Sequence, residues 1–366
     1  MADVLAVSRQ RPPRVQPGYT PTAEPQDSPV THMVSADVVP SPSAANLQAG
    51  SGPDGAAGSP AASPRLPVDP TITDDAVARP LVPFLFWADI VNNNLWRSNI
   101  DGSERAAVTS SENVAAPDGV AVDPEDRYVY WTNMGNPVGG SNAGTVRRMQ
   151  LDTQDVQTVV PVGITNTPKQ LRIDPIARKL YWADREGAKV WRSSLDGSDV
   201  EVLVRGHDLM QLVGLALDVQ KRQFYFSDRM ARKIFRASFD MPPGRDADTR
   251  ADVETLLSFD VASMPLDLEL DLEERLIYWT DRMRGTIQRA PMEPPAELGS
   301  AERTDIDTLV ANLVEPIGLS LDHVDHRMYF SQLSGEIGRV DLHGEHLEVL
   351  VTAGSASGLT LAHLPK

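Results

Sequence analysis

The stretch Tyr278-Trp279-Thr280-Asp281 decides the fold of this 366-residue chain, because variants of it recur along the sequence. Successive copies begin 44, 51, 44, 53 and 51 residues apart. The six copies are FWAD (Phe86–Asp89), YWTN (Tyr130–Asn133), YWAD (Tyr181–Asp184), YFSD (Tyr225–Asp228), YWTD (Tyr278–Asp281) and YFSQ (Tyr329–Gln332). A strand-rich repeat of roughly 40–50 residues is typical of propeller blades. The sequence therefore predicts an all-β, six-bladed β-propeller.

Four short strand signals separated by turns make up each repeat. The first is an apolar run that ends in Asp, such as GLALD at Gly214–Asp218, and the aromatic motif is the second. The fourth is a closing apolar run such as Glu201–Val204. The third strand carries a recurrent arginine: Arg97, Arg147, Arg192, Arg236, Arg289 and Arg339.

The two ends of the repeat region complement one another. The first motif, at Phe86, has no first strand before it, whereas the chain ends with GLTLA at Gly358–Ala362, a first strand with no motif after it. We predict that this C-terminal strand completes blade one, which leaves only short, protected sheet edges. The propeller is expected to span residues 81–366.

Residues 1–80 have a different composition from the repeats. They hold nearly half of the chain's 29 prolines and none of its six tryptophans, and they are rich in Ala, Ser, Gly and Asp. Such a segment cannot bury enough apolar surface to offset the entropy of ordering it. We predict a disordered N-terminal tail.

Charge and cysteine content narrow the function. The formal net charge is −17, which disfavours nucleic acid and anionic membrane as partners. The chain has no cysteine, so a disulfide framework, a thiolate nucleophile and a cysteine-ligated metal are excluded. No stretch approaches the ~20 apolar residues of a membrane helix, and no signal peptide is recognisable. We expect a cytoplasmic monomer without a cofactor.

The six motifs resemble the YWTD β-propeller of the low-density-lipoprotein-receptor family. The resemblance covers about residues 84–363 and includes a third strand with a characteristic turn, VWRSSLDGS at Val190–Ser198. In that family the propeller binds protein ligands on one face, assists their release and is not an enzyme. Family members usually carry flanking cysteine-rich modules, which this chain lacks, so the resemblance implies a fold and a binding face.

The motif aspartates and the third-strand arginines are expected to be structural. An Asp at a strand end commonly accepts hydrogen bonds from turn amides. We expect each arginine to pair with such an Asp and hold neighbouring blades together. Asn133 and Gln332 replace the Asp in two copies, and they keep the hydrogen-bonding capacity without the charge.

The first strand of a blade lines the central channel. Its second and fourth residues are aliphatic in nearly every copy, so the first and third are expected to face the channel. In blades one, two, four and six these are small or hydroxylated: Gly358 and Thr360, Gly119 and Ala121, Gly214 and Ala216, Gly318 and Ser320.

Blades three and five place larger polar residues at the same positions. Blade three has Gln170 and Arg172, and blade five has Asp267 and Glu269. Unpaired charges there would be costly to desolvate. Two interpretations stay open: a bridge between Arg172 and Glu269 that tightens the ring, or a polar floor for a small ligand. Blade five alone offers too few oxygen ligands for Ca²⁺, and we expect no metal.

The loops at one end of the channel carry further candidates for ligand binding. Asp118 and Gln211 precede first strands, and Arg185, Arg229 and Arg282 each follow a motif Asp. The arginines suit a carboxylate- or phosphate-bearing ligand, although solvated turn residues would have the same pattern. The glycine-rich loop Met134–Gly144 is expected to be mobile.

Histidines are the remaining candidates for chemistry. His207 precedes a first strand and is a candidate general base. His323 and His326 lie with Asp325 in a turn on the opposite face. This turn has some metal-ligand character, but a solvated surface turn is the simpler interpretation.

Two functions remain open. The first is a binding module that presents the channel mouth to a protein segment or a small molecule. The alternative is an enzyme for a small metabolite, a hydrolase, lyase or cyclase, in which Arg172 orients the substrate and Asp267, Glu269 or His207 moves protons. The sequence has no G-x-S-x-G elbow, no H-E-x-x-H helix and no P-loop.

Overall fold

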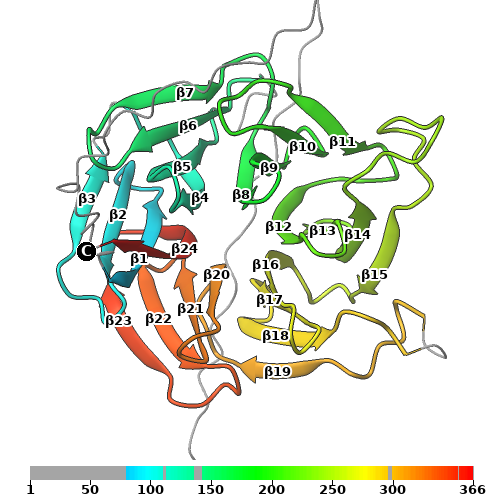
Figure 1. Cartoon of the computed structure of the whole chain (residues 1–366). Coiled ribbons are helices and arrows are strands. Elements are labelled where there is room, and N and C mark those ends of the chain that lie inside the picture. Colours follow the sequence, from blue (N-terminus) through cyan, green and yellow to red (C-terminus); the bar gives the residue numbers. More distant parts are fainter. Residues whose placement is uncertain (1–79, 110–112, 136–141, 296–298, 353, 366) are drawn as a thin grey trace, which may run out of the picture. The chain divides into compact units, whose positions relative to one another are not determined.

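The computed structural model describes residues 80–109, 113–135, 142–295, 299–352 and 354–365. Within these residues, 24 strands form six four-stranded antiparallel sheets arranged around one axis (Figure 1). The predicted six-bladed, all-β propeller is therefore confirmed. The predicted tail, except Pro80, and residues 136–141 of the loop Met134–Gly144 lie outside the described residues.

The inner strands surround the axis, and each contacts the inner strands of the neighbouring blades. From blade one to blade six they are β24 (Ala356–Pro365), β4 (Pro117–Asp123), β8 (Pro168–Asp174), β12 (Leu212–Asp218), β16 (Pro265–Asp271) and β20 (Pro316–Asp322).

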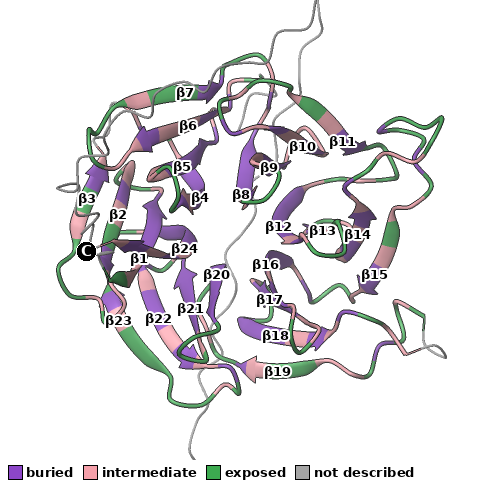
Figure 2. Cartoon of the chain, in the orientation of Figure 1, coloured by how far each residue is buried: buried purple, intermediate pink, exposed green. Residues whose placement is uncertain are grey.

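The second strands carry the aromatic motif, and their motif residues are buried between the blades (Figure 2). In the same order they are β1 (Leu81–Asp89), β5 (Tyr128–Asn133), β9 (Lys179–Asp184), β13 (Gln223–Asp228), β17 (Leu276–Asp281) and β21 (Arg327–Gln332).

The two outer strands of each blade complete the sheet. The third strands are β2 (Asn94–Asn99), β6 (Thr145–Gln150), β10 (Lys189–Ser194), β14 (Lys233–Ser238), β18 (Thr286–Pro291) and β22 (Glu336–Asp341). The fourth strands are β3 (Ala106–Thr109), β7 (Val156–Val160), β11 (Glu201–Arg205), β15 (Glu254–Ser258), β19 (Asp307–Val310) and β23 (Glu348–Thr352).

Blade one joins the two ends of the described chain. β24 pairs antiparallel with β1, with Phe86 opposite Thr360 and Trp87 opposite Leu359. The sheet order is β24-β1-β2-β3, so the C-terminal strand is the inner strand of the first blade. The predicted closure is confirmed.

The apolar core is divided into clusters that cross from one blade to the next. Tyr181 of blade three packs with Phe224 and Phe239 of blade four, and the Tyr181 and Phe239 ring centroids lie 5.0 Å apart. Large rings bury about 150–250 Å² each, so the motif aromatics supply much of the contact that holds adjacent sheets together.

The motif acids bind turn amides, as predicted. Asp228 accepts hydrogen bonds from the backbone amides of Met210, Gln211, Met230 and Ala231, at 2.6 to 3.1 Å. Asn133 and Gln332 accept from the amides of Ala115 and Val314 in the same way. One side chain therefore fixes the two loops that meet at this end of the blade.

The predicted partner of the third-strand arginines was wrong. Arg192 Nη1 donates to the Phe239 carbonyl of the next blade at 3.0 Å, and its Nε donates to Glu201 at 2.9 Å. The motif aspartate does not pair with this arginine, because turn amides already donate hydrogen bonds to its carboxylate. In blade two the equivalent residue is Arg148, not the predicted Arg147, since Arg148 lies opposite Tyr130 and donates to the Leu195 carbonyl at 3.0 Å.

Candidate functional site

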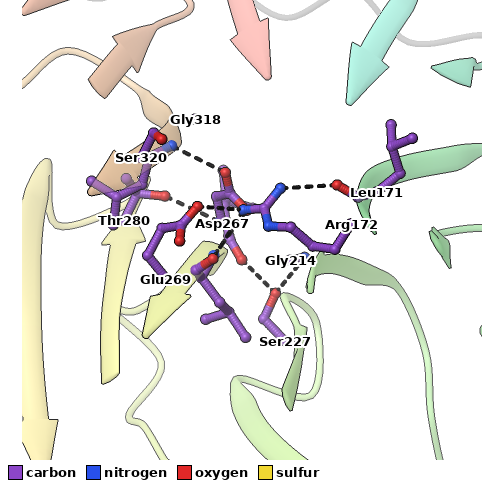
Figure 3. A network of polar contacts seen from close by, with 12 residues as sticks. Leu171, Arg172, Gly214, Ser227, Asp267, Glu269, Thr280, Gly318 and Ser320 are labelled. Carbon is purple, nitrogen blue, oxygen red and sulfur yellow. Dashed lines mark hydrogen bonds and ion pairs between the residues drawn. The ribbon is translucent and has the colours of Figure 1, made fainter. Parts of the chain in front are cut away.

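The hydroxyl in the third motif position joins adjacent inner strands around the channel. Ser227 Oγ accepts from the Gly214 amide at 2.8 Å and donates to the Leu266 carbonyl of the next blade at 2.6 Å (Figure 3). Thr132, Thr280 and Ser331 make the same pair of contacts in their blades. Blades one and three have alanine at this position.

The first channel position of blades two to six lies in a β-bulge. The glycines at this position in blades two, four and six, Gly119, Gly214 and Gly318, face the neighbouring blade, which corrects the expectation that they face the channel. A Cβ on Gly214 would lie 2.0 Å from the Leu266 carbonyl oxygen, and one on Gly119 would lie 2.4 Å from the Lys169 carbonyl oxygen. The glycines therefore permit close contact between inner strands.

Arg172, Asp267 and Glu269 meet in the channel, and we call them the channel triad. Arg172 Nη2 lies 3.0 Å from Asp267 Oδ1 and 3.0 Å from Glu269 Oε1 (Figure 3). The same guanidinium donates to the Leu268 carbonyl at 3.0 Å, and the other Asp267 oxygen accepts from the Leu319 amide at 3.0 Å. One arginine therefore links blades three and five across the axis, and Asp267 extends the link to blade six.

Both channel carboxyls hold their protons more strongly than free acids. Burial raises the pKa of Asp267 to about 6, against the attraction of Arg172 and two backbone amides. Burial also raises the pKa of Glu269 to about 7, again opposed by Arg172 and reinforced by the charge of Asp267. Two carboxylates share one guanidinium here, so a proton retained by the triad neutralises it.

A small cavity adjoins the triad. Its volume is about 150 Å³, and Arg172 and Glu269 line it together with aliphatic residues of the inner strands such as Leu217 and Leu270. Ligand pockets for drug-sized molecules are larger, at about 300–1,000 Å³. The cavity suits waters or a very small molecule.

Gln170 does not join the triad. It is fully buried, and neither of its amide atoms has a hydrogen-bond partner among the described residues. Nearby on the neighbouring blade, Asp118 Oδ2 lies 2.6 Å from Lys169 Nζ, while Asp118 Oδ1 is buried without a partner in the described part of the chain. Buried polar groups are nearly always bonded, so this side of the channel entrance has unused hydrogen-bonding capacity.

Burial lowers the pKa of Lys169, and the charges of Arg185 and Arg229 lower it further, whereas Asp118 opposes the shift. These residues therefore share one electrostatic environment at the channel entrance. The sequence pattern did not single out this buried Lys–Asp pair as a unit.

The residues that follow the six motifs form what we call the mouth ring. Each donates its backbone amide to the loop before an inner strand, as Arg229 does to the Gln211 carbonyl at 3.0 Å. From blade one to blade six the members are Ile90, Met134, Arg185, Arg229, Arg282 and Leu333. Half of the ring is basic and the other half is apolar, and comparing the residue after each motif would have revealed this in the sequence.

Arg229 lies in the middle of the basic half. Its Nε donates to Gln211 Oε1 at 2.7 Å, and among the described residues it forms no salt bridge. Its neighbours are partly neutralised, Arg185 by Glu186 at 2.5 Å and Arg282 by Glu315 at 3.1 Å. Partial burial and repulsion by Arg185 and Arg282 lower the pKa of Arg229. An anion placed beside Arg229 would therefore be stabilised.

The histidine candidates lie away from the channel triad. His207 is exposed in the turn between β11 and β12, with a φ of 56°. His323 and His326 are exposed in the turn between β20 and β21, on the opposite face. The structure thus brings together Arg172, Asp267 and Glu269, but not His207. Among the described residues, no helix is both long and apolar enough to span a membrane.

The chain is similar in sequence to several known proteins. It is 31% identical over 283 residues to a Pyricularia oryzae protein named low-density lipoprotein receptor-related protein 1, a match that covers 71% of this chain and 89% of that protein. It is 32% identical over 253 residues to the 3-hydroxyacyl-CoA dehydrogenase-like protein LAM1 of Cochliobolus heterostrophus, covering 62% of this chain and 52% of that protein. The chain therefore spans about half the length of this second relative.

Solved structures support the fold. The nidogen/laminin complex contains a chain that matches with a TM-score of 0.60 and 18% identity, over 76% of this chain and 98% of that one. TolB from Acinetobacter baumannii matches with a TM-score of 0.55 and 13% identity, over 77% and 66%. No protein-family model matches the chain. From its six motifs, its closed ring and its relative in Pyricularia, the chain belongs to the YWTD β-propeller family of low-density-lipoprotein-receptor class B repeats.

Proposed function

We propose that this propeller is a binding module whose mouth ring takes an acidic, partly apolar protein segment. The observation that carries the proposal is the division of the ring, with Arg185, Arg229 and Arg282 on one half and the partly exposed Leu333 and Ile90 on the other. Met134, the sixth member, is buried beneath them against Lys169. A ligand that fits both halves presents carboxylates on one side and an apolar side chain on the other.

The surroundings of the ring favour a protein segment over a small molecule. Exposed apolar side chains lie in the loops of the same face: Val91, Val162, Met210, Met230, Val261, Met283 and Val314. Methionine and arginine are enriched in the cores of protein interfaces. The cavity beside the channel triad has a volume of about 150 Å³, so the loop face provides the larger contact area.

The charge of the partner follows from Arg229. Bidentate pairing of a guanidinium with a carboxylate is a strong, directional contact, and Arg229 has no acidic partner among the described residues. An incoming Asp or Glu side chain would relieve its repulsion with Arg185 and Arg282. The unpaired atoms of Gln170 and Asp118 add hydrogen-bonding groups near the same entrance.

Selection of peptides from a random display library against the purified full chain tests the proposal. We expect enriched peptides to carry Asp or Glu within a few residues of an aliphatic side chain. Arg229→Glu should weaken binding of such a peptide at least tenfold, because it replaces an attraction by a repulsion. Arg245→Glu, an exposed change of the same charge away from the mouth ring, should leave the affinity unchanged.

Two results would contradict the proposal. One is enrichment of peptides without acidic residues, and the other is equal loss of binding in Arg229→Glu and Arg245→Glu. The second would show that only the net charge of the protein matters.

One observation favours the alternative, an enzyme with its site in the channel. Glu269 is a partly buried acid with a pKa of about 7, beside Arg172 and at the edge of a cavity, and perturbed acids of this kind are common in active sites. Native mass spectrometry of the full chain and of an Arg172→Ala, Glu269→Ala variant checks this function. A small-molecule adduct present only on the unchanged chain would support it, and no adduct on either would count against it.

A further inference from the structure

On the face opposite the mouth ring, an arginine of one blade is held by three acids of the blade before it. Arg178 of blade three lies 2.6 Å from Asp123 Oδ2 and 3.2 Å from Glu125 Oε2, and it also pairs with Asp126. Asp123 ends β4, and Glu125 and Asp126 lie in the turn between β4 and β5. The geometry shows that three carboxylates of this turn can converge on one cation.

Blade five repeats the acidic turn, but blade six lacks the arginine. Asp271, Glu273 and Glu274 occupy the positions of Asp123, Glu125 and Asp126 in the turn between β16 and β17; we call these three residues of blade five the acidic cradle. The residue of blade six that corresponds to Arg178 is His326, with the same positive φ, 51° against 54°.

A cavity of about 480 Å³ lies between the acidic cradle and blade six. Three histidines of blade six line it, His323 and His326 from one turn and His343 from another. His323 Nδ1 lies 3.9 Å from Asp271 Oδ2. Among the described residues, no three ligand atoms of these histidines and carboxylates lie within 4.8 Å of one another. The three imidazoles are exposed, so a change of their rotamers would be needed to bring them onto one ion with the carboxylates.

We propose that this cavity binds a divalent transition metal ion of the Zn²⁺ class, held by the imidazoles of blade six and carboxylates of the acidic cradle. Imidazole nitrogen and carboxylate oxygen are ligands that Zn²⁺ takes at about 2.0–2.2 Å, usually four in number. A chain without cysteine has histidine as its best remaining ligand for such ions. The one guanidinium that lines the cavity, Arg289, is engaged by Asp307 at 3.3 Å and by the Leu342 carbonyl at 3.1 Å.

The bound ion would replace the missing arginine. In the blade two–blade three pair the cation belongs to the chain, whereas in the blade five–blade six pair it comes from solution. Contact between these two blades would then depend on the free concentration of the metal.

Zinc titration of the full chain, stripped with a chelator, tests the site by calorimetry. We expect one Zn²⁺ per chain and a rise in melting temperature when zinc is added. His323→Ala with His343→Ala should weaken binding at least tenfold. His326→Arg should abolish binding while keeping the metal-free melting temperature at or above that of the unchanged chain, because it restores the arginine seen in blade three.

The control is His207→Ala with His346→Ala, two histidines outside the cavity. It should bind zinc like the unchanged chain. The proposal is wrong if no stoichiometric zinc binds, if His326→Arg binds zinc as before, or if the control loses it. The last result would move the ion to Asp341, Glu345 and His346, which lie close together elsewhere on blade six.

Discussion

At the scale of single residues, the carboxyls of the channel triad stay protonated at pH values at which ordinary carboxylic acids are already ionised. Asp267 and Glu269 bond to the same nitrogen of Arg172, so full ionisation leaves one uncompensated negative charge in the channel. Their folded-state pKa values, about 6 and about 7, lie above the ordinary values of 3.8 and 4.5. Unfolding therefore releases protons between about pH 4 and pH 7, and stability falls as the pH rises through that range.

Replacing Glu269 by glutamine should reverse part of that loss. The amide oxygen can still accept from Arg172, but it carries no charge. We expect Glu269→Gln to be more stable than the unchanged chain by about 1–3 kcal/mol at pH 8, with the difference shrinking toward zero at pH 5. Urea unfolding at both pH values measures it.

Glu254→Gln is the matched control, because Glu254 is exposed and pairs with Arg236 at the surface. Its effect should be small and similar at both pH values. A stabilisation by Glu269→Gln that is constant with pH, or larger at pH 5, would rule out a retained proton.

Residue alternation predicted the triad but not all of its contacts. Arg172 and Glu269 lie 97 residues apart in the sequence, and only the ring places them opposite each other (Figure 1). The bond from the Leu319 amide to Asp267 depends on the β-bulge, which turns that side chain toward blade six. Bulges leave no clear mark in a single sequence, so this contact and the orientation of Gly214 were missed.

At the scale of the strand, the blades are joined by polar contacts as well as by aromatic packing. The motif hydroxyl bonds an inner-strand amide of its own blade and a carbonyl of the next, in four of the six blades. Blade one instead uses Ser357 of the inner strand, whose hydroxyl donates to the Pro117 carbonyl of blade two at 3.2 Å. The third motif residue is thus an inter-blade link.

Removing one such hydroxyl should lower the free energy of unfolding by more than the loss of a single small polar group suggests. Ser227→Ala leaves the Gly214 amide and the Leu266 carbonyl buried without their partner. We expect a loss of about 2–4 kcal/mol in the free energy of unfolding, because each unpaired buried group costs about 1–3 kcal/mol. Chemical denaturation of the variant measures the loss.

Ser103→Ala removes a hydroxyl whose contacts lie within an exposed turn, and its cost should stay below about 0.5 kcal/mol. Equal effects in the two variants would mean that the hydroxyl is not an inter-blade link.

The motif spacing predicts the strands, but it does not distinguish Arg147 from Arg148 as the inter-blade arginine. Two adjacent arginines cannot be told apart without the register of β5 and β6.

At the scale of the whole molecule, the ring is closed by a strand that lies 274 residues after the motif it joins, counting from Phe86 to Thr360. The length and spacing of the repeats were enough to predict six blades and the closure. They were not enough to predict the cavity between the acidic cradle and blade six, because it gathers residues of two blades that lie far apart in the sequence.

Deleting residues 357–366 should unfold the propeller. The deletion removes most of β24 and exposes the edge of β1, together with Trp87 and Leu85. We expect loss of the cooperative thermal transition followed by circular dichroism. A synthetic peptide of residues 356–365 should restore the transition to the shortened chain, whereas a scrambled peptide should not. A shortened chain that melts like the full one would disprove the closure.

The place of β24 also sets an order of events during synthesis. The ribosome makes the inner strand of blade one after all the other described strands, so the ring cannot close until β24 has left the exit tunnel. Until then β1 has an open edge, and Ile90 of the mouth ring lacks the bond to Ser355 that fixes its loop. A ligand that needs both halves of the ring can therefore bind only after β24 has been synthesised and has closed the ring.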